Sequence, residues 1–180
     1  IDINDYSDEK VEDFIKSNRY DIVLYGSIVT HYKWIKWLTK TIKKYHPKTS
    51  VIVGNSVSGS IPEVFLRNSP ADIAVIGEAE ATVLEIIDAL NDKNEIYDSS
   101  VLEKINGLAF IDEDGKYVQT AIRKGQKKLD DFPMINWEYF DVENYILKGS
   151  QAALDIGSKE VIRAMPLITA RGCVFRCTFC

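Results

Sequence analysis

The sequence predicts an α/β fold, with a parallel β-sheet covered by helices on both faces. Three short apolar runs that each end at glycine indicate strands buried on both faces, at residues 20–26, 50–54 and 71–77. The segments between them place apolar residues at helical spacing. Strands that alternate with helices are joined by right-handed crossovers and pair in parallel, which is a Rossmann-like or flavodoxin-like arrangement.

The predicted helices have local start signals. Ser7 suits the N-cap of a helix over residues 8–18, whose first turn is acidic. A second helix is expected over residues 32–45, and Pro62 suits the first turn of a third. The helix over residues 79–91 is expected to bury an apolar face made of Val83, Leu84, Ile86, Ile87 and Leu90.

The pattern changes after this helix. Two β-type runs around Asp114-Gly115 predict a hairpin at residues 105–122, which would complete an α/β domain spanning residues 1–123. We interpret residues 124–165 as a linker. The run PLITA is expected to be a short strand that opens a further domain at residues 166–180.

Composition excludes several classes of protein. The 180 residues are 46% hydrophobic and 27% charged, which is typical of a soluble globular chain. No apolar run approaches the ~20 residues that cross a bilayer, and the acidic N-terminal segment is unlike a signal peptide. A net charge of −5 without a basic cluster argues against a nucleic-acid surface. We expect a cytoplasmic protein with no nucleic-acid partner and no membrane span.

All three cysteines, Cys173, Cys177 and Cys180, stand at the end of the chain. Thiolates spaced this closely on one loop can converge on a metal centre, and three ligands leave one position for a non-protein group. Structural zinc needs a fourth ligand, whereas His31 and His46 are far away in the sequence. A redox pair would leave the third thiol unexplained. The spacing therefore favours an iron–sulfur cluster.

The segment RGCVFRCTFC resembles the signature of radical S-adenosylmethionine enzymes, Cys-x3-Cys-x-aromatic-Cys, with Phe179 as the aromatic residue. The resemblance implies a 4Fe–4S cluster on the three thiolates, with S-adenosylmethionine on its fourth iron. An external electron donor would reduce the cluster, and reductive cleavage of S-adenosylmethionine would yield a 5′-deoxyadenosyl radical. It also implies that residues 166–170 form the first strand of a (β/α) barrel that is incomplete here. The substrate would be a small molecule of unknown identity.

The strings YDIVLYGSIVT, VIVGNSVSGSIPEVFL and ADIAVIGEAEATVLEII are similar, in order and spacing, to the cobalamin-binding region of radical S-adenosylmethionine proteins. That group includes methyltransferases and the anaerobic porphyrin ring cyclase. The resemblance implies a cobalamin at the carboxyl ends of the strands, where open parallel sheets bind ligands. The candidate cofactor residues follow those strands: Gly26, Ser27, Ile28, Thr30, Gly54, Asn55, Ser56, Gly77, Glu78 and Ala79.

The chain departs from this family's pattern in several places. His31 lacks the Asp and Gly that accompany a cobalt-binding histidine in many cobalamin proteins, so we expect no protein histidine on cobalt. Gly26 stands where members often have serine, and Asn55 replaces the second glycine of the usual pair. Members also begin with an additional strand, so we expect an unpaired sheet edge here.

We therefore interpret the chain as part of a cobalamin-dependent radical S-adenosylmethionine enzyme, of the oxidoreductase or methyltransferase type. The alternative is a radical S-adenosylmethionine enzyme whose α/β domain has lost cobalamin and serves as a docking or packing module. A third hypothesis is a non-enzymatic domain that ends in three thiols. None of the 180 residues is expected to be catalytic, and the piece alone is expected to be inactive because the barrel is incomplete.

Overall fold

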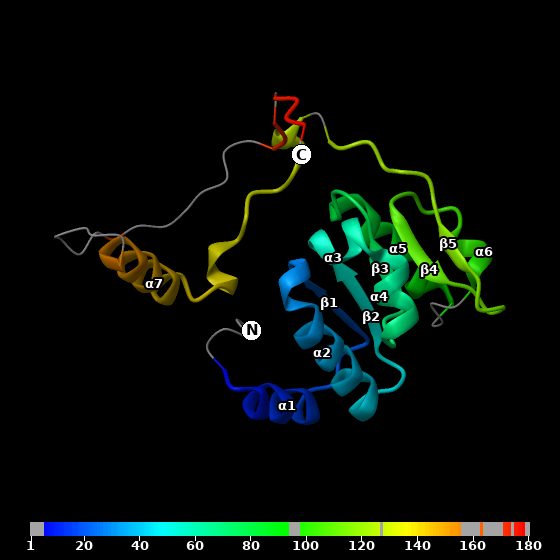
Figure 1. Cartoon of the computed structure of the whole chain (residues 1–180), viewed down its shortest axis with the longest axis horizontal. Coiled ribbons are helices and arrows are strands. Elements are labelled where there is room, and N and C mark those ends of the chain that lie inside the picture. Colours follow the sequence, from blue (N-terminus) through cyan, green and yellow to red (C-terminus); the bar gives the residue numbers. More distant parts are fainter. Residues whose placement is uncertain are drawn as a thin grey trace. The chain divides into compact units, whose positions relative to one another are not determined.

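In the computed structural model, which describes residues 6–93, 98–126, 128–155, 163, 171–173 and 175–178, five strands form one sheet (Figure 1). The strands lie in sequence order and are β1 Ile22–Gly26, β2 Ser50–Gly54, β3 Ile73–Val75, β4 Leu108–Ile111 and β5 Tyr117–Gln119. The first three are parallel, with Ile22 opposite Ser50 and Ile52 opposite Ile73. The predicted parallel α/β sheet is confirmed.

The hairpin also forms, and it joins the same sheet. Strand β4 runs antiparallel to β3, with Ile73 opposite Phe110, and β5 runs antiparallel to β4. Gly115 in the turn has a φ of +77°, and Asp112 Oδ1 accepts a 2.8 Å hydrogen bond from Lys116 N–H. The antiparallel hairpin therefore extends the parallel half of the sheet rather than forming a separate body.

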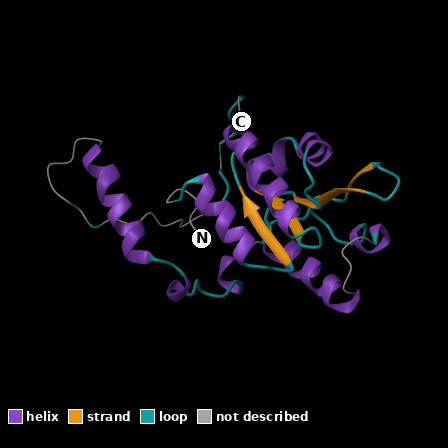
Figure 2. Cartoon of the chain, turned by 90° about the horizontal axis from the view of Figure 1, so that it is seen from below, coloured by secondary structure: helices purple, strands orange, loops and turns teal. Residues whose placement is uncertain are grey.

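Helices occupy both faces of this sheet (Figure 2). They are α1 Asp8–Ser17, α2 Tyr32–Tyr45, α3 Asn55–Ser60, α4 Pro62–Asn68, α5 Glu80–Lys93 and α6 Ser99–Leu102, with a 3-10 turn, η2, at Val29–His31. The four predicted helices are confirmed within one or two residues at each end. The sequence does not predict α3, because its six residues have no apolar periodicity.

Alternate residues of each strand point to opposite faces, so the core has two layers. Val53 and Ala74 face one layer, where they pack with Phe65 of α4 and Ile35 of α2. The other layer packs α5 and α6 against the sheet, and its buried residues are Ile52, Ile73, Val75, Ile86, Leu102, Ile105, Leu108 and Phe110. Because Phe65 is completely buried, truncating it to alanine is expected to cost about 3–5 kcal/mol.

Two of the burial predictions are wrong. Leu24 in β1 is 46% exposed, although the apolar run predicts a strand buried on both faces. Its exposure arises because β1 is the end strand of the sheet among the described residues. Leu84 in α5 is 63% exposed. The apolar residues of α5 cover a wide part of the helix surface, and only the part that contains Ile86 packs against the core.

A buried ion pair joins α2 to the amino ends of β2 and β3. Lys43 Nζ lies 2.6 Å from Asp72 Oδ2, which also accepts a 2.6 Å hydrogen bond from Val51 N–H. The Asp72 side chain is 7% exposed. Burial raises the pKa of Asp72, more than the hydrogen bonds from Lys43 and Val51 lower it. This carboxyl group therefore connects three elements at the end of the sheet opposite the candidate site.

The chain divides into two units, residues 1–127 and 128–180. The second contains η3 Leu129–Asp131, η4 Trp137–Tyr139 and α7 Val142–Asp155, so a long helix lies within the predicted linker. Within this unit the Arg171 guanidinium stacks 5.2 Å from the Phe132 ring centre. The predicted strand at 166–170, together with Phe179 and Cys180, lies outside the described residues.

Candidate functional site

Two of the three predicted loops, those after β1 and β2, are joined by hydrogen bonds at the carboxyl edge of the sheet. Val29 N–H donates to Ser56 Oγ over 3.2 Å, and Val57 N–H donates to the Ser27 carbonyl over 3.3 Å. These bonds connect the segment after β1 with the start of α3, which follows β2. Because β1 and β2 are parallel neighbours, the two loops leave the sheet at the same edge and form one surface.

This surface combines exposed apolar side chains with hydrogen-bonding groups. Ile28 is 49% exposed and Val29 is 41% exposed. Beside them, the Ser27 hydroxyl lies 3.2 Å from His31 Nδ1, and Thr30 is exposed. Binding sites for bulky cofactors are mostly apolar with a few convergent polar groups, which is the composition found here.

Asn55 determines the turn between β2 and α3. Its φ is +64°, a left-handed conformation that glycine adopts readily and that asparagine tolerates best among other residues. Its side-chain Oδ1 accepts a 2.6 Å hydrogen bond from Ser56 N–H, and its carbonyl accepts a 2.9 Å bond from the Ser58 hydroxyl. The asparagine thus preserves the backbone geometry that a glycine would supply.

Gly26 is explained by the same turn. A Cβ added at Gly26 would lie 3.1 Å from the Asn55 Cβ, which is closer than almost all real contacts of this type. The two loops therefore approach so closely that a side chain at the end of β1 would require Asn55 to shift by a few tenths of an ångström. Both departures from the family's pattern, at Gly26 and at Asn55, belong to one local arrangement.

The third loop is joined to a different segment. Gly77 has a φ of +84°, and Glu78 Oε2 accepts a 3.1 Å hydrogen bond from Gln126 N–H. A Cβ at Gly125 would lie 3.0 Å from the Glu78 carboxylate, so the glycine allows the segment after β5 to approach. The loop after β3 leaves the same edge of the sheet as the other two, and Glu78 fixes the 125–126 backbone beside it.

Arg123 lies beside this edge of the sheet and is not among the site residues that the sequence predicts. Its Nε donates to Thr82 Oγ1 over 2.9 Å, and its Nη2 lies 2.6 Å from Glu85 Oε2. Arg123 therefore holds the segment after β5 against the first turns of α5. A lone arginine after a hairpin carries no sequence signal for this role, because its partners stand about 40 positions earlier.

The cysteine loop is described only in part. Cys173 and Cys177 are exposed free thiols, and Phe175 N–H points to Cys173 Sγ at 3.5 Å. Cys180 and Phe179 lie outside the described residues. Among the residues that the structure does describe, no group of three or more His, Cys, Asp or Glu side chains is arranged to hold a metal ion. The cluster therefore stays a prediction from the sequence.

Within the part of the chain that the structure describes, no helix is both long enough and apolar enough to cross a membrane.

Comparison with known proteins bears on this edge of the sheet. Residues 1–87 match the family model of the B12 binding domain. The chain is 25% identical over 196 residues to cytidylyl-2-hydroxyethylphosphonate methyltransferase of Streptomyces wedmorensis, covering 97% of this chain and 35% of that protein. It is 26% identical over 183 residues to the anaerobic magnesium-protoporphyrin IX monomethyl ester cyclase of Rubrivivax gelatinosus, covering 98% of this chain and 30% of that protein.

The fold has a solved counterpart. The cobalamin-dependent S-adenosylmethionine radical enzyme OxsB, with aqua-cobalamin and S-adenosylmethionine bound, matches with a TM-score of 0.54 and 19% identity, over 65% of this chain and 16% of that chain. This chain is a relative of the cobalamin-binding radical S-adenosylmethionine proteins. It spans about a third of the length of the two curated relatives.

The described residues fit a cobalamin. A corrin ring presents a broad apolar face and a rim of amide groups, and the edge offers Ile28 and Val29 for the first and Ser27, Thr30 and Asn55 for the second. The open space around Gly77 leaves the backbone there accessible to a bulky ligand.

Proposed function

We propose that this chain binds cobalamin across the carboxyl ends of β1, β2 and β3, as part of a radical S-adenosylmethionine enzyme. The contact residues would be Gly26, Ser27, Ile28, Thr30, Gly54, Asn55, Ser56, Gly77, Glu78 and Ala79. The observation that carries the proposal is the bonded pair of loops, which lies within the residues that match the B12 binding domain.

The residues at this edge have distinct tasks in the proposal. Ile28 and Val29 exclude water from the corrin face, and Ser27, Thr30 and Ser56 bond the amide rim. The turn at Asn55 keeps these groups preorganised, so that the ligand does not have to order them. The bound cobalamin would supply the transferable group or the reactive metal, as cofactors do in such enzymes.

The cysteine loop completes the proposed enzyme. Cys173, Cys177 and Cys180 would hold a 4Fe–4S cluster, with S-adenosylmethionine at the fourth iron and near Phe179. The exposure of Cys173 and Cys177 leaves their thiols accessible to iron. An external donor would reduce the cluster, a small molecule would be the substrate, and residues 166–180 would begin the barrel.

Cobalamin binding can be tested on this chain with hydroxocobalamin. The protein is incubated with the corrinoid and desalted, and the visible spectrum of the protein fraction is recorded. We expect bound corrinoid near one equivalent. Ile28→Glu is expected to weaken binding about tenfold or more, because it places a charge under an apolar ring. Leu84→Glu, a change at an exposed site on α5, serves as the matched control. A wild-type chain that retains no corrinoid would favour the docking-module alternative.

The axial position on cobalt gives a second readout. His31 follows Thr30 without the Asp and Gly that accompany a cobalt-binding histidine in many cobalamin proteins. We therefore expect His31→Ala to leave the visible spectrum of the bound cobalamin unchanged. A shift of the cobalamin bands in this variant would show that the histidine binds cobalt.

The cluster needs a separate experiment. The chain is reconstituted with iron and sulfide without oxygen, and bound iron and labile sulfide are measured for wild type and for Cys177→Ala. We expect about four of each in the wild type. The variant is expected to lose most of both. If neither iron nor sulfide is bound by the wild type, the hypothesis of a non-enzymatic domain that ends in three thiols is correct instead.

A further inference from the structure

The segment after β5, residues 121–126, leaves the sheet at the same edge as the three loops of the candidate site. Strand β4 runs antiparallel to β3 and β5 runs antiparallel to β4, so β5 points in the same direction as β3. Backbone pairing continues past the strand ends, where Ile76 N–H donates to the Gly107 carbonyl and Gly107 N–H donates to the Ala121 carbonyl, both over 2.8 Å. We call residues 121–126 the exit segment, because the first unit of the chain ends at residue 127.

Arg123 attaches the first half of the exit segment to a buried hydrogen-bond network. Its side chain is 21% exposed, and its guanidinium binds both Thr82 and Glu85. Thr82 is completely buried, and its hydroxyl donates in turn to the Asn106 carbonyl over 3.0 Å. None of these partners is a candidate cofactor residue. This half of the exit segment is therefore held in place independently of any ligand.

Glu78 attaches the second half of the exit segment at a more exposed place. Its carboxylate accepts the hydrogen bond from Gln126 N–H, and Gln126 is exposed to solvent. A hydrogen bond at an exposed site contributes little net free energy, so it can open locally while the sheet and the Arg123 network stay intact. We call this contact between Glu78 and Gln126 the clamp.

The clamp acts on the loop of the cofactor edge that follows β3. Gly77, which precedes Glu78, has a φ of +84°, and no atom lies within 4 Å of a Cβ built on it. A ligand that contacts this accessible backbone would hold Gly77 in one conformation, and with it the direction of the Glu78 carboxylate. Conversely, a closed clamp presents the Gly77 backbone to the ligand already ordered. Ligand binding and clamp closure therefore favour each other.

We propose that corrinoid binding at the carboxyl edge is coupled to closure of the clamp, so that occupancy of the cofactor site fixes the exit segment. This coupling rests on the proposed cobalamin binding and adds a regulatory property to the same site. Besides the contact proposed above, the Glu78 carboxylate acts as a positioning group. Linkage requires that the clamp raise corrinoid affinity by the same factor by which the corrinoid stabilises the clamp.

The clamp can be opened without changing a candidate cofactor residue. A Cβ added at Gly125 would lie 3.0 Å from Glu78 Oε1, so Gly125→Ala displaces the carboxylate from Gln126 N–H. Gly125 lies outside the left-handed region of φ, so alanine fits its backbone. Lys124→Ala, a change at the exposed neighbouring residue, is the matched control.

Corrinoid affinity is measured by equilibrium dialysis of the 180-residue chain against hydroxocobalamin. We expect Gly125→Ala to bind about three- to tenfold more weakly than wild type, the effect of one lost hydrogen bond. Lys124→Ala is expected to bind within about twofold of wild type. Glu78→Ala removes the same contact from the other side. Because the two changes open one clamp, the double variant is expected to bind no more weakly than Glu78→Ala alone.

Hydrogen exchange of the Gln126 amide measures the clamp directly, and it is followed by NMR with and without saturating hydroxocobalamin. We expect exchange in the wild type to slow by the same factor, about three- to tenfold, and we expect this effect to disappear in Gly125→Ala. Lys116 N–H, which donates to Asp112 Oδ1 in the hairpin turn at the opposite edge, is the matched control. The wild-type measurement keeps the coupling testable even if a variant does not fold.

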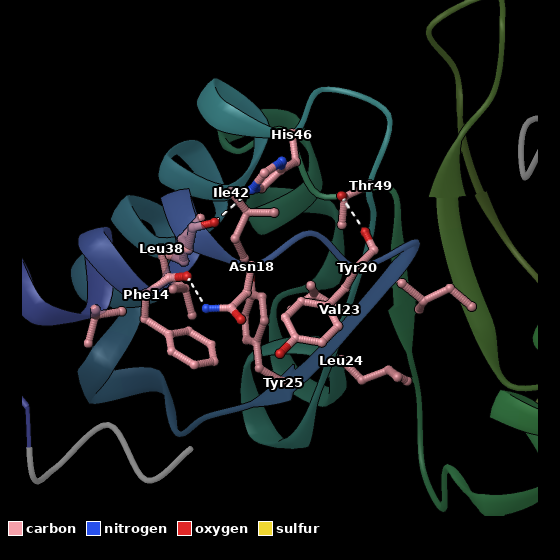
Figure 3. A pocket seen from close by; sticks show the side chains of 13 residues that line it. Phe14, Asn18, Tyr20, Val23, Leu24, Tyr25, Leu38, Ile42, His46 and Thr49 are labelled. Atoms are coloured by element: carbon pink, nitrogen blue, oxygen red, sulfur yellow. Dashed lines mark hydrogen bonds between the residues drawn. The ribbon is translucent and has the colours of Figure 1, made fainter.

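Binding of the corrinoid elsewhere on the chain needs its own control. A groove of about 350 Å³ lies between α1, β1 and α2, and its apolar lining includes Phe14, Leu38 and Ile42 (Figure 3). It shares no residue with the clamp. Phe14→Lys places a charge in this groove and is expected to bind hydroxocobalamin within about twofold of wild type. Loss of binding in this variant would place the corrinoid in the groove, which overturns both the coupling and the proposed cofactor edge.

The other outcomes separate the coupling from the proposed function. A wild-type chain that binds no hydroxocobalamin overturns both. If the wild type binds but Gly125→Ala binds equally well, or if the Gln126 amide exchanges at the same rate with and without corrinoid, only the coupling is wrong. Equal slowing at Gln126 and Lys116 would mean that the corrinoid stabilises the whole fold, which also overturns the coupling.

Discussion

Substitutions at Asn55 test how much its left-handed backbone conformation contributes to the stability of the carboxyl edge of the sheet. The left-handed conformation costs an ordinary residue about 1–2 kcal/mol, and asparagine less. The hydrogen bond from Ser56 N–H to its side chain contributes about 0.5–1 kcal/mol, since the site is exposed. Asn55→Ala keeps the φ of +64° and loses the hydrogen bond, so we expect a loss of about 1.5–2 kcal/mol.

Asn55→Gly separates the two effects. Glycine also loses the side-chain bond, but it adopts the left-handed conformation without strain, so we expect a free energy of unfolding within about 0.5 kcal/mol of wild type. Both variants are compared with wild type by urea unfolding at pH 7, followed by circular dichroism. If the alanine variant is as stable as the glycine variant, the backbone at this position does not carry the strain that we assign to it.

Two further predictions concern stability. Lys43→Met removes the cation beside the buried Asp72 carboxylate and is expected to cost about 3–5 kcal/mol at pH 7. Burial already raises the pKa of Asp72 in the folded chain. The protonated form therefore stabilises the fold below the unfolded pKa of about 4. This contribution is lost as the pH rises through the folded pKa. The deficit of the variant should thus be smaller at pH 4 than at pH 7, and urea midpoints that show equal deficits would contradict this. Gly107→Ala is expected to cost about 2–4 kcal/mol, because its φ is +84° and an added Cβ would lie 3.2 Å from the Ile76 carbonyl oxygen. Gly115→Ala, with a φ of +77° and open space, is the control and should cost only about 1 kcal/mol, as thermal unfolding of the two variants can show.

The sequence predicts the repeating elements because each has a local cause. The apolar runs that end at Gly26 and Gly54 mark strands, and helical spacing of apolar residues marks α2 over the range 32–45 that the structure has. Helix α3 has no such cause. It is six residues long, and the turn at Asn55 and the packing of Val57 in the core determine it, which are tertiary effects.

The sequence predicts where the candidate site lies, but not the contacts within it. Glycines, hydroxyls and amides after parallel strands indicate the edge at which a ligand binds, and the structure places two of the three loops in direct contact there. The contact of Glu78 with Gln126 joins residues 48 positions apart, and Arg123 reaches back 41 positions to Thr82. No short-range pattern specifies these pairs, because they depend on how the hairpin joins the sheet.

The arrangement at this edge depends on backbone conformation more than on the identity of side chains. Asn55 holds the positive φ that a glycine pair would supply, and Gly26 leaves room for it. A chain can therefore depart from the family's residues at both positions and still match the B12 binding domain. We therefore predict that a substitution at Asn55 that preserves the left-handed turn preserves this edge of the sheet. Serine at Gly26 would place a Cβ 3.1 Å from the Asn55 Cβ, so Asn55 would have to shift by a few tenths of an ångström to accept it.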